Sequence, residues 1–167
     1  MSDIIWSGVA SDTGTAPTRD FLVQHDQGEV PCALWLPAEA PPKGLILVGH
    51  GGSRHKREIT NLTFIEEAVE RNGFAVAAID GPLHGARRGD RSPDPSDIQR
   101  DFLDLWQLPG NGIASMLADW QAALTGLLDE LKDKRLPIGY FGLSMGTAYG
   151  LPLLAADKRV GAAVIGM

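Results

Sequence analysis

The chain has 167 residues, a length that fits one domain (1–167) able to bury a hydrophobic core. Its 44% hydrophobic and 22% charged residues are ordinary for a globular protein, and its net charge of −6 argues against a nucleic-acid partner, which usually meets a basic face. Cys32 is the sole cysteine, so no intrachain disulfide can form. No apolar stretch could span a bilayer, and we expect a soluble, cytoplasmic protein with no membrane partner.

The first predicted elements are strands. Residues 21–24 and 30–36 have the composition of two strands, and Asp26-Gln27-Gly28 between them is typical of a hairpin turn. Residues 44–49 form a continuous apolar run bounded by glycine. Such a run indicates a strand buried on both faces, as in a parallel sheet.

The remaining segments alternate between helix and strand. Apolar residues at helical spacing predict helices over residues 62–69 and 113–131, and buried strands are predicted over 74–80, 138–143 and 160–167. A further helix is expected to begin near the end of the strand at 138–143. This alternation predicts an α/β fold with a mostly parallel sheet flanked by helices and right-handed crossovers.

Residues 85–112 interrupt that alternation. The segment is polar and rich in proline as far as residue 97, and then Ile98, Phe102, Leu105 and Trp106 recur at helical spacing. Loops of this length in a compact domain often act as lids or binding loops. The segment is therefore either a lid or cap insertion, or a surface excursion whose short helix covers the sheet.

A G-x-S-x-G pattern follows the strand predicted at 138–143. Gly142-Leu143-Ser144-Met145-Gly146 suits a serine held on a strained turn between a buried strand and a helix, where glycines avoid collisions across the tight corner. An apolar strand precedes it and a helix-compatible stretch follows it, which is the context that the motif requires. We interpret Ser144 as a nucleophile rather than as part of a Gly/Ser turn.

A second glycine-rich segment, Gly49-His50-Gly51-Gly52-Ser53, follows the strand at 44–49. Acyl transfer needs two N–H donors aimed at the developing oxyanion. We expect the amide of Met145, next to the nucleophile, to be one donor and the amide of Gly52 to be the other. The alternative is a plain glycine-rich turn.

Histidines decide whether Ser144 can be activated, because a serine hydroxyl needs a base. The 23 residues after Ser144 contain no histidine. His84, after the strand at 74–80, lies at the sheet end where ligands bind, but a structural histidine is the better interpretation, and we expect His50 to orient its own loop.

His25 and His55 are expected to be solvated, as is the short basic cluster Arg54-His55-Lys56-Arg57. No metal-ligand spacing, dinucleotide fingerprint or P-loop is present, so neither a metal nor a cofactor is expected.

These motifs together resemble the α/β-hydrolase superfamily, particularly its dienelactone-hydrolase-like and small-esterase branches. The resemblance runs from about residue 20 to the end of the chain. It implies Ser144 as nucleophile and the Met145 and Gly52 amides as the oxyanion hole. His50, Gly51 and His84 are candidate substrate-binding residues. Dienelactone hydrolases have cysteine as nucleophile, so serine here favours ester or thioester hydrolysis, with a small-molecule ester or acyl substrate.

The family continues with two further strands whose loops carry the acid and the histidine. We therefore expect the chain to be the N-terminal part of a hydrolase, truncated after the strand that follows the nucleophile helix. An exposed terminal strand would also allow self-association. The alternative is a short, non-catalytic α/β-hydrolase-like binding or assembly module, or one that borrows the missing strands from a partner.

Overall fold

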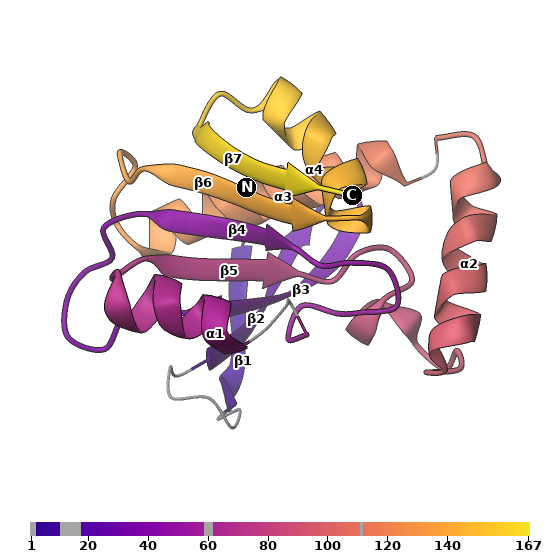
Figure 1. Cartoon of the computed structure of the whole chain (residues 1–167), viewed down its shortest axis with the longest axis horizontal. Helices are drawn as coiled ribbons and strands as arrows, with labels where there is room; N and C mark the ends of the chain where they lie inside the picture. Colours follow the sequence, from indigo (N-terminus) through magenta and orange to yellow (C-terminus); the bar gives the residue numbers. More distant parts are fainter. Residues whose placement is uncertain (1–2, 11–17, 59–61, 111) are drawn as a thin grey trace.

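The computed structural model describes residues 3–10, 18–58, 62–110 and 112–167, which form a seven-stranded mixed sheet flanked by helices (Figure 1). The strands in chain order are β1 (Asp3–Ala10), β2 (Thr18–His25), β3 (Gly28–Trp35), β4 (Leu45–Gly49), β5 (Ala75–Ile79), β6 (Ile138–Leu143) and β7 (Val160–Gly166). In the sheet they lie in the order β1-β2-β3-β5-β4-β6-β7. The predicted α/β fold is confirmed.

The two halves of the sheet differ in strand direction. Strands β1, β2 and β3 form antiparallel pairs, and β3 is also antiparallel to β5, whereas β5, β4, β6 and β7 run parallel. The predicted hairpin is present, because His25 at the end of β2 pairs with Gly28 at the start of β3. Strand β1 has no counterpart among the predicted strands, and a register shift between Trp6 and Gly8 interrupts its pairing.

Helices cover both faces of the parallel half. They are α1 (Leu62–Ile65), continued by the π-helix η1 (Glu66–Arg71), then the 3₁₀-helix η2 (Gly85–Arg88), α2 (Pro95–Gln107), α3 (Ile113–Glu130) and α4 (Met145–Ala156). Helix α1 covers one face, and α3 and α4 pack on the other, while α2 stands beyond the carboxyl ends of the parallel strands (Figure 1).

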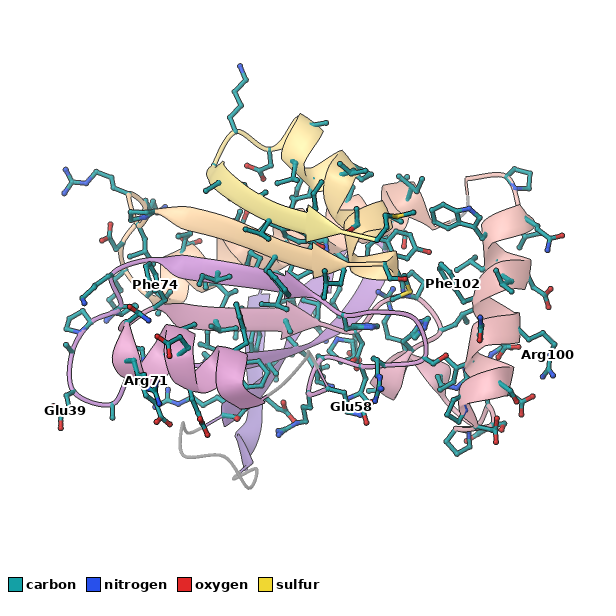
Figure 2. All side chains as sticks on the ribbon, viewed as in Figure 1. Glu39, Glu58, Arg71, Phe74, Arg100 and Phe102 are labelled. Carbon is teal, nitrogen blue, oxygen red and sulfur yellow. The ribbon has the colours of Figure 1, made fainter. Side chains whose placement is uncertain are left out.

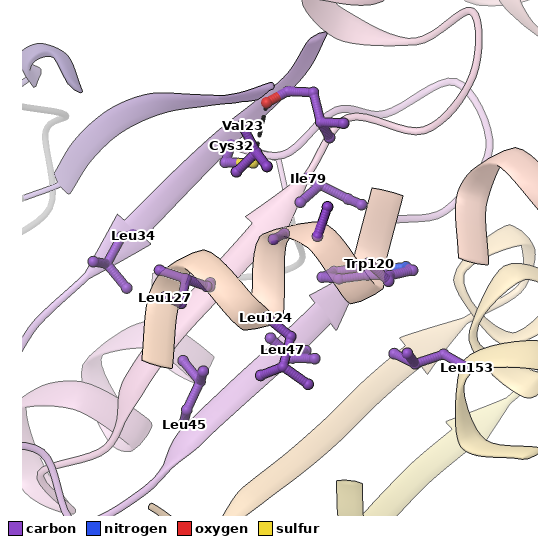
Figure 3. Packing of buried hydrophobic residues seen from close by; sticks show 14 of the residues in the cluster. Val23, Cys32, Leu34, Leu45, Leu47, Ile79, Trp120, Leu124, Leu127 and Leu153 are labelled. Carbon is purple, nitrogen blue, oxygen red and sulfur yellow. Dashed lines mark hydrogen bonds between the residues drawn. The ribbon is translucent and has the colours of Figure 1, made fainter. Parts of the chain in front are cut away.

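Alternate residues of the central strands face two separate hydrophobic clusters. Leu45 and Leu47 pack in the larger cluster with Trp120, Leu124 and Leu127 of α3 (Figure 3). The smaller cluster, on the face of α1 and η1, consists of Ala33, Trp35, Val48, Ile65, Ala68, Val69, Val76 and Ala78. Burial on both faces explains why these strands are apolar at every position.

Two further features concern Cys32 and β7. Cys32 is fully buried in β3, and burial raises the pKa of its thiol. Strand β7 forms one edge of the sheet and is largely exposed, Val164 by 63% and Ile165 by 41%. Within the described ranges, no helix has the length and apolar character needed to cross a membrane.

Candidate active site

Three loops meet at the carboxyl edge of the parallel strands, after β4, β5 and β6. Gly49 at the end of β4 pairs with Gly142 near the end of β6, which brings the loops that follow side by side. A Cβ on Gly81, after β5, would lie 3.0 Å from the Cε of Met145. The topology therefore brings together the loops that carry Gly52, His84 and Ser144.

Backbone strain is concentrated at this edge. Four non-glycine residues of the described chain have positive φ, and three of them, Ser53, Leu83 and Ser144, lie in the three converging loops. Residues other than glycine rarely adopt this backbone conformation. It costs of order 1–3 kcal/mol and persists where the surrounding structure imposes it. Such clustering is typical of a functional site.

Ser144 occupies the turn between β6 and α4. It has φ 53° and ψ −117°, its side chain is exposed, and its N–H donates to the carbonyl of Gly166 at 2.9 Å. Its own carbonyl accepts from the N–H groups of Thr147 and Ala148 in the first turn of α4. This is the strained strand–turn–helix geometry that presents a serine hydroxyl to solvent.

The glycines of the motif allow the turn to pack against β4. A Cβ on Gly142 would lie 2.7 Å from the carbonyl oxygen of Gly146, and a Cβ on Gly146 would collide with the carbonyl of Gly49. The hydroxyl of Tyr140, buried beneath them, donates to the Gly146 carbonyl at 2.6 Å, and burial raises the pKa of this phenol. The backbones of β4 and α4 are thus in direct contact.

Thr147 is a structural member of the site that sequence reasoning missed. Its Oγ1 lies 2.8 Å from the Gly142 carbonyl and 2.6 Å from the Gly166 carbonyl, and it accepts the Gly166 N–H at 3.1 Å. One hydroxyl therefore links the end of β7 to the turn. Its place just after the motif is the only sequence cue to this role.

The two predicted oxyanion donors lie in different elements. Met145 is the first residue of α4, where backbone N–H groups have no partner within the helix, and its side chain is 4% exposed. Gly52 is exposed, and a Cβ built on it would meet no atom within 4 Å. The space around Gly52 is open to a ligand.

His50 and His84 are both buried, and their ring nitrogens face backbone groups. The Nε2 of His50 accepts the Gly81 N–H at 2.9 Å, and its Nδ1 lies 2.8 Å from the Gly51 carbonyl. The Nε2 of His84 accepts the Ser53 N–H at 3.3 Å, and its Nδ1 lies 2.7 Å from the Pro82 carbonyl. Burial lowers the pKa of His50 to about 4 and also lowers that of His84.

These shifts predict a pH-dependent stability. Because His50 has a folded pKa of about 4 and an unfolded value of 6.5, the unfolded chain takes up a proton first as the pH falls. The free energy of unfolding should therefore decrease between pH 6.5 and 4, by roughly 3 kcal/mol from this residue. Urea unfolding at pH 7, 5.5 and 4.5 measures this effect. The difference in free energy of unfolding between the wild type and His50→Asn should become smaller as the pH falls. Parallel pH profiles for the two proteins would contradict this.

The prediction that the basic cluster at residues 54–57 is solvated is only partly right. Arg54 is exposed, but the ammonium of Lys56 lies 2.9 Å from a carboxylate oxygen of the fully buried Asp80. Asp80 also accepts the backbone N–H groups of Lys56 at 2.8 Å and Ala86 at 2.9 Å. This ion pair joins the loop after β4 to the end of β5.

The prediction that His25 is solvated is wrong. Its side chain is 12% exposed, and its Nε2 lies 2.8 Å from the carboxylate of Asp119 in α3, which also binds Arg87 of η2 at 2.5 Å. His55, in contrast, is 39% exposed, as expected.

The segment 85–112 supplies an aromatic wall beside the site. The side chain of Phe102, a residue of α2, lies between the helix and the carboxyl ends of the strands (Figure 2). Its ring is edge-on to His84 and to Tyr149, with centroid distances of 5.9 Å and 6.2 Å. Trp106 packs edge-on against Tyr149 at 5.7 Å. A pocket of about 720 Å³ extends from Gly52 and Ser53 to α2.

No histidine that the structure describes is placed as a base for Ser144. His50 and His84 have both ring nitrogens at backbone groups, His25 binds Asp119, and His55 lies beside Glu58. Within the same residues, no group of three His, Cys, Asp or Glu is arranged to hold a metal ion.

Comparison with known proteins adds to this geometry. A cold-adapted esterase from an Arctic intertidal metagenomic library is 34% identical and superposes with a TM-score of 0.76, over 98% of this chain and 65% of the esterase. A thermostable carboxyl esterase from Bacillus coagulans is 22% identical with a TM-score of 0.64, over 89% of this chain and 43% of that one, which speaks for the fold alone. The chain has an α/β-hydrolase-like fold.

The curated relatives are named for a different activity from that of the esterases. A Mycobacterium tuberculosis protein, provisionally named a phosphoribosyl transferase, is 30% identical over 159 residues. These residues are 95% of this chain but 31% of that protein, so the chain spans about a third of its relative. No protein-family profile matches the chain.

Proposed function

We propose that this α/β-hydrolase-like chain carries the nucleophile and oxyanion hole of a serine hydrolase that acts on carboxylic esters or related acyl compounds. The observation that carries the proposal is Ser144, exposed on a positive-φ turn between β6 and α4. The similarity of the chain to a 34% identical esterase also supports ester hydrolysis.

In the proposed reaction, Ser144 Oγ attacks the ester carbonyl carbon while its proton passes to a base. The N–H groups of Met145 and Gly52 donate to the oxygen as negative charge develops on it. The tetrahedral intermediate then expels the alcohol, which takes up the proton, and water hydrolyses the acyl-enzyme to free Ser144. The pocket that Gly52, Ser53 and Ile98 of α2 line lies beside the oxyanion loop. In this proposal it receives part of the substrate, and residues 85–112 act as the lid.

The proposal requires a base that the described histidines do not supply. The 167-residue chain by itself should therefore turn over esters very weakly, with a residual rate due to the oxyanion hole and to substrate binding. The name of the mycobacterial relative suggests transferase chemistry instead, but this chain spans only 31% of that protein.

A non-catalytic binding or assembly module is the second candidate. It is favoured by two observations. The ring nitrogens of His50 and His84 are already hydrogen-bonded to backbone groups, and apolar side chains are exposed on the edge strand β7. In this case the site would hold a ligand without forming a covalent bond, and β7 would be the surface for self-association.

The experiment is an intact-mass measurement of the natively expressed protein before and after treatment with a fluorophosphonate probe. The measured mass shows whether the natural protein is longer than this 17.9 kDa chain and can therefore supply the base. When it is longer, we expect a single adduct on Ser144 that is absent from the Ser144→Ala variant. The absence of an adduct from the wild type, with the fold intact, would contradict the hydrolase proposal and favour the binding module.

A further inference from the structure

His50 and His84 form a reciprocal pair of contacts between the loops after β4 and β5. His50, in the first loop, accepts the N–H of Gly81 in the second at 2.9 Å. His84, in the second loop, accepts the N–H of Ser53 in the first at 3.3 Å. The two rings lie 5.2 Å apart between centroids, so each loop holds the other.

The partners of the rings determine where their protons lie. A backbone N–H can only donate, so Nε2 of each ring must be unprotonated, and a carbonyl can only accept, so Nδ1 must carry the proton. Both rings are therefore neutral Nδ1–H tautomers. Protonation at Nε2 would point an N–H at another N–H and break the contact.

The same contacts fix the peptide units on both sides of Gly52. The Gly51 carbonyl, which accepts from His50 Nδ1 at 2.8 Å, belongs to the same planar trans peptide as the Gly52 N–H. Because C=O and N–H point in opposite directions in such a peptide, binding this oxygen to a buried ring directs the Gly52 N–H away from it. His84 fixes the next peptide through the Ser53 N–H.

Helix α2 holds this arrangement from outside. The Ser53 hydroxyl donates to the carbonyl of Pro95, the first residue of α2, at 3.0 Å. The ring of Phe102 packs edge-on against His84, and Arg88 binds Asp101 of α2 at 3.1 Å. The aromatic wall of α2 and the loop of Gly52 are therefore joined by direct contacts.

We infer that His50 and His84 are positioning residues that orient the Gly52 amide toward the oxyanion, neither of them acting as the base. This inference rests on the proposed hydrolase function and extends it to residues that do not touch the reacting atoms. It also assigns the two buried histidines a shared task, although they lie 34 positions apart in the sequence.

The experiment combines NMR of the histidine rings with labelling kinetics of the natively expressed protein. At pH 7, the ¹⁵N shifts of His50 and His84 should identify both as Nδ1–H tautomers, and the amide protons of Gly81 and Ser53 should exchange slowly. An Nε2–H tautomer or a charged ring at either position would overturn the inference, whatever the variants do.

His84→Phe keeps a ring but removes both hydrogen bonds, whereas the carbonyl of Gln in His84→Gln can still accept the Ser53 N–H. We expect His84→Phe to lower the maximal rate of fluorophosphonate labelling at least about tenfold without changing the concentration for half-maximal rate, and His84→Gln to recover part of it. His55→Gln, at an exposed ring, is the matched control. Labelling of His84→Phe at the wild-type rate would overturn the inference.

The two proposals fail in different ways. If wild-type Ser144 is not labelled, the hydrolase function and the oxyanion role both fall, even where NMR finds the two tautomers. If Ser144 is labelled but the Ser53 amide exchanges freely, the hydrolase function stands and the positioning role falls.

Discussion

Replacing Asp80 with alanine is expected to lower the free energy of unfolding by about 3–5 kcal/mol, the range for breaking a buried ion pair. Asp80 is fully buried and binds the Lys56 ammonium together with the backbone N–H groups of Lys56 and Ala86. Its removal leaves a cation that is 11% exposed without its counter-charge. Urea unfolding followed by circular dichroism measures the loss.

A surface ion pair is the matched control. Glu67 and Arg71 also form an ion pair, at 3.0 Å, but their side chains are 55% and 72% exposed. Glu67→Ala should cost no more than about 0.5 kcal/mol. Adding Lys56→Met to Asp80→Ala should recover part of the loss, because the stranded charge is then gone. A loss below about 1 kcal/mol in Asp80→Ala would contradict the buried pairing.

Gly146→Ala is expected to destabilise the protein by about 3 kcal/mol or more, at the upper end of overpacking effects. The added Cβ would collide with the carbonyl of Gly49, which is backbone and cannot turn away as a side chain can. The turn that carries Ser144 would have to move away from β4. The urea midpoint should fall, and labelling of Ser144 should fall with it.

Gly139→Ala is the control for this change, since Gly139 lies in the neighbouring strand β6. Its Cβ would meet only the Ala162 carbonyl at 3.8 Å, an ordinary contact, so stability should stay within about 0.5 kcal/mol of the wild type. Equal stability of Gly146→Ala and wild type would show that α4 does not rest on the end of β4.

Local patterns in the sequence are enough to predict most strands and the turn at Ser144. The apolar runs of β4 and β5 and the glycines at 142 and 146 carry their information within a few neighbouring residues. Strand β1 is harder to predict, because it lies at the sheet edge and its pairing shifts between Trp6 and Gly8.

The charged contacts of the site could not be predicted in this way. Lys56 pairs with Asp80, 24 positions away, and His25 with Asp119, 94 positions away, so nothing near either residue indicates its partner. Composition alone favours a solvated loop for a run such as residues 54–57. Only the fold shows that Lys56 turns inward while Arg54 stays exposed.

The placement of β4 between β5 and β6 determines how the chain can assemble. Leu45 pairs with Ala75 on one side and with Ile138 on the other, so the centre of the sheet is complete only when very distant segments meet. The β2–β3 hairpin, in contrast, closes through a two-residue turn. Since non-local pairings slow folding, we expect the antiparallel ribbon to form early and the nucleophile turn to form late, once β6 has docked.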